Sequence, residues 1–168
     1  MNKEEQIREW FENKLSTIRY YIDDLKTLSI PFIYKSVCDI KSGFFNAILR
    51  SIKNKEYKKL KNCLYELLCA VIFIFLYEEK TLTDDNITSY LFHLKNTLID
   101  KNRKYNNSYD DTVDLLGEII IAGRLHDKIA RFNYCKENNM EDDEDTLLDI
   151  AGYSVLSLIY LENKELKQ

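Results

Sequence analysis

Apolar residues recur every three or four positions along most of the chain, which is the spacing of one face of an α-helix. Residues 3–28 show this pattern first, and Pro31 is then expected to stop the helix or to bend it. Residues 33–52 form a second amphipathic helix, which Gly43 weakens. The third helix, over residues 64–77, is so uniformly apolar that it predicts the buried centre of the fold.

The second half of the chain continues with helical spacing and has clearer boundaries. A fourth helix follows the capping residues 83–85. A polar loop at 106–111 precedes a fifth helix over 112–135, and a second polar segment at 136–142 precedes a sixth over 143–165. Because the last connection is short, the final two helices are expected to form an antiparallel hairpin. The pattern therefore predicts an all-α fold, a bundle of about six helices in a single helical domain, residues 1–168.

The composition supports this prediction and restricts the function. The 168 residues include one proline and four glycines, too few for a turn-rich fold. A net charge of −4 argues against direct binding to nucleic acid, because such domains usually carry a basic excess. The longest apolar run, residues 67–77, is shorter than the roughly 20 residues that span a bilayer. The N-terminus has no apolar segment of the kind found in secretion signals. We therefore expect a cytoplasmic protein with no membrane partner.

Two charged stripes fall on the last two predicted helices. Arg124, Lys128 and Arg131 are spaced four and three residues apart, so they share one face of the fifth helix. Asp145 and Asp149 are four apart and share a face of the sixth. In a hairpin, the basic stripe would stand near the acidic one.

Two interpretations of these stripes remain open. Carboxylates four residues apart can hold one Mg²⁺ together with waters and phosphate oxygens, so Asp145 and Asp149 are candidate metal ligands and catalytic residues. Glu118 could add a third carboxylate or act as a base. Alternatively, the opposite charges form interhelical ion pairs that contribute little beyond register. Asp149 favours the first interpretation, because it lies between Leu148 and Ile150, beyond the first turn where the helix dipole stabilises negative charge.

Three blocks of the C-terminal half resemble a known family. They are KNRKYNNS at 101–108, RLHDKIAR at 124–131 and EDTLLDIAGY at 144–153. Their order and spacing are similar to those of the nucleotide-modification-associated domain of the first type, which is frequent in bacteriophage genomes. The resemblance covers about residues 95–163 and leaves residues 1–90 without a role. Asn106 stands where the family favours glycine, and since asparagine tolerates the left-handed conformation, we expect the turn to survive there.

The resemblance implies a nucleotide or nucleotide-like ligand and a link to nucleotide or DNA modification. The residues that would hold phosphates are Lys101, Arg124, Lys128 and Arg131, and those that would stack on a base are Tyr105 and Tyr153. The sixth helix is also similar to that of all-α nucleoside-triphosphate pyrophosphatases, which bind Mg²⁺ and often work as dimers, although their Glu-Glu-x-x-Glu motif is missing here. The first hypothesis is therefore a Mg²⁺-dependent nucleotide phosphohydrolase, with a possible homodimer. The alternative is a non-catalytic nucleotide or protein binder, such as a phage-encoded antagonist of host defence.

Overall fold

The computed structural model describes residues 2–138, 140 and 143–166, and within them the chain forms eight α-helices and no strand. The all-α prediction is confirmed. The helices are α1 (Lys3–Leu25), α2 (Ile30–Cys38), α3 (Phe44–Lys53), α4 (Tyr57–Glu78), α5 (Asp84–Tyr105), α6 (Ser108–Leu116), α7 (Ile119–Glu137) and α8 (Asp143–Glu165).

The helix starts at α1 and α5 follow from local capping chemistry. Asn2 and Glu5 form a capping box, in which each side chain accepts a hydrogen bond from the other's backbone N–H. Thr83 accepts a hydrogen bond from the backbone N–H of Asn86 at the start of α5. These caps bind N–H groups that have no partner within the helix, which is why short polar residues mark the boundaries.

The second predicted helix is split into α2 and α3, which corrects the expected range of 33–52. Asp39 causes the break, because its carboxylate accepts hydrogen bonds from the backbone N–H groups of Lys41 and Ser42. Gly43 then begins α3 so close to α2 that a Cβ atom would lie 2.2 Å from the Ser36 carbonyl oxygen. Pro31 does not end a helix but lies in the first turn of α2, where its missing N–H costs nothing.

The fifth predicted helix is also split. Gly117, with φ of 83°, separates α6 from α7. Residues 108–111 already belong to α6, so the expected loop at 106–111 is reduced to a tight turn. The sequence predicted about six helices, and the described residues form eight, because two of the predicted helices are each divided in two.

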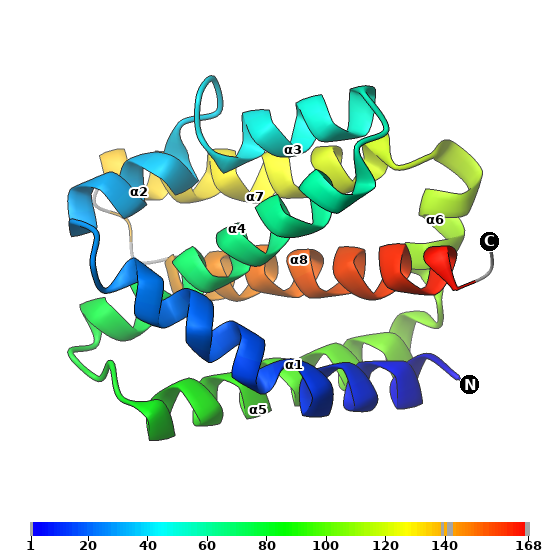
Figure 1. Ribbon diagram of the computed structural model, residues 1–168, viewed down its shortest axis with the longest axis horizontal. Helices are drawn as coiled ribbons and strands as arrows, with labels where there is room; N and C mark the ends of the chain where they lie inside the picture. The colour runs from blue at the N-terminus through cyan, green and yellow to red at the C-terminus, as the bar shows by residue number, and fades with distance from the viewer. Residues whose placement is uncertain (1, 139, 141–142, 167–168) are drawn as a thin grey trace.

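One hydrophobic core joins the two halves of the chain. In Figure 1, α8 runs across the middle, with α7, α3 and α2 on one side and α1 and α5 on the other, while α4 crosses it diagonally. The central pair is α4 and α8, whose facing residues are almost all buried. The two described ends of the chain lie at the same side of the molecule, beside α6. The N-terminal half therefore supplies much of the core on which the C-terminal helices pack.

The α4 helix is long and apolar enough to cross a membrane by composition, and it is the one such helix among the described residues. Some 67% of its most apolar window is buried inside the protein. That burial is typical of the core helix of a soluble protein.

Candidate functional site

A cavity of about 420 Å³ lies between α5, α6 and α8 and is also lined by Arg124 of α7, so it gathers side chains from all three sequence blocks. Lys101 and Tyr105 come from α5, Arg124 from α7, and Asp149 and Tyr153 from α8. We call this the basic cavity. Its volume falls in the range of small-molecule sites, about 300–1,000 Å³. Five of the nine residues that the sequence proposed for a site therefore meet at one cavity.

Asp149 lies at the edge of this cavity and is held by two lysines. Its Oδ1 accepts a hydrogen bond from Lys101 Nζ at 2.7 Å, and its Oδ2 lies 2.8 Å from Lys128 Nζ. Burial alone would raise the pKa of Asp149, but the two ammonium groups outweigh it and hold that pKa below its ordinary value. The charge of Asp149 is thus tolerated within the apolar run of α8, because Lys101 of α5 and Lys128 of α7 both pair with it.

The cations of the cavity keep free hydrogen-bonding capacity. An ammonium group has three donors, and the contact with Asp149 uses one of those of Lys101, whose side chain is 52% exposed. Arg124 is exposed, and no carboxylate of the described residues lies within ion-pair distance of it. Its guanidinium is therefore available for a bidentate contact with an anion.

Part of the cavity wall is aromatic and closely packed. The rings of Tyr109 and Tyr153 lie 6.0 Å apart, and the Tyr109 hydroxyl is hydrogen-bonded to Ser157 Oγ at 2.5 Å. Burial raises the pKa of Tyr109 well above its ordinary value, so the ring stays neutral. At the cavity floor, Gly152 lets α5 approach α8, because a Cβ there would lie 3.2 Å from Leu98 Cδ2. The site thus offers ring faces beside positive charge.

A tight turn follows α5 at Asn106. Asn106 has the positive φ expected from the resemblance, 53°, but not the left-handed helical conformation that asparagine tolerates. Its ψ of −157° places it in a region that glycine adopts far more easily than other residues. The turn directs Asn106 and Asn107 to the rim, where both line the cavity.

The remaining predicted residues lie elsewhere. Lys128 contacts Asp149 but does not line the cavity, and Arg131 is exposed on α7 about one turn further on. Asp145 is exposed in the first turn of α8 and does not line the cavity either. The structure therefore places Asp149, and not Asp145, at the site.

Glu118 lies at the opposite end of the helical hairpin. It begins α7, accepts a hydrogen bond from Lys164, and lies 3.5 Å from the Tyr57 hydroxyl. The bond from Lys164 lowers the pKa of Glu118. Fifteen residues of α8 separate Asp149 from Lys164, which at about 1.5 Å per residue is about 22 Å. Because α7 and α8 are antiparallel, Glu118 cannot share a catalytic centre with Asp149, which corrects the sequence-based grouping.

These carboxylates do not fit a magnesium site in this arrangement. Both oxygens of Asp149 already contact ammonium groups, and Glu118 is too distant to complete a ligand set. Among the described residues, no group of three or more His, Cys, Asp or Glu side chains could hold a metal ion. Metal dependence therefore stays a prediction to be tested by binding.

Sequence reasoning missed Lys3, which reaches the cavity from the start of the chain. Its ammonium group lies 2.7 Å from Asp110 Oδ2 and is almost fully buried. Burial lowers the pKa of Lys3, although the neighbouring carboxylate opposes the shift. A separation of 107 residues between the partners leaves no local pattern by which the pair could be found.

Comparison with protein-family models, with curated proteins and with solved structures finds no match to this chain. The family resemblance therefore rests on the three sequence blocks alone.

Proposed function

We propose that the protein binds a nucleotide in the basic cavity, with its phosphate beside Lys101 and Arg124. The observation that carries the proposal is the convergence of Lys101, Tyr105, Arg124 and Tyr153 from three helices on one cavity of about 420 Å³. A phosphate oxygen is the acceptor that suits ammonium and guanidinium donors best. Tyr105, whose side chain is 58% exposed, and Tyr153 offer ring faces on which a base can stack.

Binding without hydrolysis is the form of this function that the geometry favours. The predicted catalytic carboxylates are dispersed: Asp149 is engaged by two lysines, Asp145 is outside the cavity, and Glu118 is at the other end of α8. Hydrolysis in the presence of Mg²⁺ is tested in the same experiment, by measuring phosphate release.

The test compares two arginines of α7. Inorganic phosphate, pyrophosphate and the common mononucleotides are titrated by calorimetry into the wild type and into the variants Arg124→Gln and Arg131→Gln. Arg124 lines the cavity and Arg131 does not, although both are exposed on the same helix. We expect Arg124→Gln to weaken binding about tenfold or more, the loss of one charge-assisted contact of about 1.5–3 kcal/mol. Arg131→Gln should leave the dissociation constant unchanged.

Two results would contradict the proposal. Equal effects of both variants would mean that the anion binds to the general charge of α7 and not in the cavity. If no phosphate compound binds to the wild type, the protein-interaction hypothesis replaces it. Turnover of a nucleotide with Mg²⁺ would instead establish the hydrolase hypothesis.

A further inference from the structure

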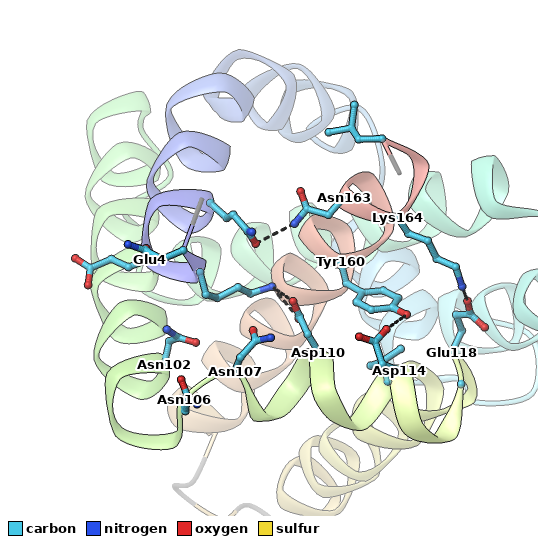
Figure 2. Close-up of a pocket in the computed structure, with 16 residues that line it drawn as sticks. Glu4, Asn102, Asn106, Asn107, Asp110, Asp114, Glu118, Tyr160, Asn163 and Lys164 are labelled. Atoms are coloured by element: carbon cyan, nitrogen blue, oxygen red, sulfur yellow. Dashed lines mark hydrogen bonds and ion pairs between the residues drawn. The ribbon is translucent and has the colours of Figure 1, made fainter. Parts of the chain in front are cut away.

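A second, larger cavity of about 940 Å³ adjoins the basic cavity (Figure 2). It lies along α6, with the start of α1 and the end of α8 on its other sides, and we call it the polar groove. Lys3, Asn102, Asn106 and Asn107 line both spaces, so the two are neighbours. A ligand long enough to reach past these four residues would contact both spaces.

The charges that line the polar groove are largely satisfied. Lys3 is paired with Asp110, and Lys164 donates to Glu118. Glu4 contacts Arg8 and Arg103 at 2.7 Å each. Both cations that line the groove, Lys3 and Lys164, thus have a carboxylate partner, whereas Arg124 of the basic cavity has none among the described residues.

The groups that remain are neutral hydrogen-bonding groups and a single carboxylate. Asp114 Oδ1 accepts a hydrogen bond from the Tyr160 hydroxyl at 2.8 Å, and no cation of the described residues pairs with it. Figure 2 shows the bond to Tyr160, and the second oxygen of this exposed, groove-lining residue remains an acceptor. Within the described residues, no side-chain hydrogen bond engages Asn102 or Asn106. Amides both donate and accept, which matches ribose hydroxyls and the edges of a nucleobase.

From these two compartments we infer that the ligand is a dinucleotide, with one nucleoside and a phosphate in the basic cavity and the second nucleoside in the polar groove. This inference rests on the proposed function, which it makes more specific. The basic cavity is near the lower end of the size range for small-molecule sites, whereas the groove is near the upper end, so a mononucleotide would leave most of the joint volume empty.

The experiment compares mononucleotides with dinucleotides that carry the same 5′-phosphate. The four 5′-mononucleotides and the corresponding 5′-phosphorylated homodinucleotides (for example AMP and pApA) are titrated into the wild type by calorimetry. Asp114→Asn alters the groove alone, and Asn102→Ala alters a residue that lines both spaces. Asp127→Asn makes the same charge change as Asp114→Asn at a side chain that is 76% exposed on α7 and lines neither space. Thermal melting of each variant checks that it is folded.

We expect at least one dinucleotide to bind about tenfold or more tightly than its mononucleotide. Asp114→Asn should remove most of that gain without changing mononucleotide or phosphate binding, and Asp127→Asn should change neither. If mononucleotides bind and no dinucleotide binds more tightly, the inference is wrong and the proposed function stands. A gain that survives both groove variants would also overturn it. If nothing binds, the proposed function itself fails.

Discussion

The contact of Asp149 with two lysines leads to a prediction that separates an electrostatic role from a metal-binding role. The perturbation is Asp149→Asn, which keeps the size of the side chain and removes its charge. In the wild type, the carboxylate competes with any incoming phosphate for Lys101, at 2.7 Å, and it also holds Lys128, which does not line the cavity, at 2.8 Å. The variant should therefore be less stable on its own and should bind phosphate more tightly.

The magnitude follows from the exposure of the partners. Lys101 is 52% exposed and Lys128 is 24% exposed, so their contacts with Asp149 are those of partly exposed ion pairs. Such contacts contribute about 0.5 and about 1 kcal/mol respectively, so the free energy of unfolding should fall by about 1.5 kcal/mol. For a chain of this size, that corresponds to a decrease in Tm of about 3–6 °C. Because the variant frees an ammonium group to bind phosphate, its dissociation constant for phosphate should fall about tenfold, a gain in binding free energy of about 1.4 kcal/mol.

Calorimetry with inorganic phosphate and thermal melting with and without Mg²⁺ measure both effects. Asp145→Asn is the matched control, because it makes the same charge change one turn earlier on α8 at an exposed side chain. We expect that control to leave the phosphate dissociation constant unchanged. Weaker phosphate binding in Asp149→Asn would refute the competition argument. Stabilisation of the wild type by Mg²⁺ that is lost in both variants would establish the two aspartates as metal ligands.

The same pair predicts a pH dependence with a definite sign. The folded-state pKa of Asp149 lies below its ordinary value of about 3.9, so the ionised carboxylate stabilises the folded protein at pH values above that number. The stabilisation is lost as the pH falls through the folded-state pKa. The stability difference between the wild type and Asp149→Asn should therefore be constant between about pH 6 and pH 8 and disappear in strong acid. Urea unfolding at a series of pH values measures it, and a difference that grows towards low pH would contradict the reasoning.

Three further substitutions test the fold around the two cavities by urea unfolding. Asn106→Gly should stabilise the protein by about 1 kcal/mol, because glycine relieves the backbone at φ 53° and ψ −157°; a loss of stability would show that the side chain matters more. Lys3→Met should destabilise it by about 3 kcal/mol, since Asp110 would be left without its cation at a 15% exposed site, and replacing both partners by apolar residues should restore most of that loss. Gly43→Ala should destabilise by more than about 2 kcal/mol, because a Cβ would lie 2.2 Å from the Ser36 carbonyl oxygen, and a neutral result would mean that the α2–α3 turn can open without cost.

How far the fold follows from sequence differs from element to element. The predicted ranges for the first and last helices lie close to α1 and α8, because apolar periodicity and capping residues are local properties of the chain. The split between α2 and α3 depends on Asp39, whose side chain accepts hydrogen bonds from the backbone N–H groups of Lys41 and Ser42. Such local bonds are an alternative to the hydrogen bonds of a continuous helix. Gly117 acts similarly between α6 and α7, where its positive φ, and not its low helix propensity, sets the break.

In the candidate site, too, the sequence identified individual residues, but it did not predict their contacts. Helical spacing marked Asp149 and Arg124 as candidates, the family resemblance added Lys101, and all three are at the basic cavity. Their mutual contacts depend on how α5, α7 and α8 are packed, which residue spacing within one helix does not encode. Glu118 illustrates the limit: it is ten residues before Lys128 in the sequence, yet it pairs with Lys164 near the end of α8.

By itself, the sequence determined the helical class, the buried character of α4 and the residues with chemistry to offer, because each depends on neighbours within a few positions. Only the tertiary structure decided which charges neutralise one another, that Lys3 reaches Asp110 across 107 residues, and that two cavities share a wall. Those outcomes depend on the register between helices, which is set by the summed packing of many apolar side chains and by no single local signal.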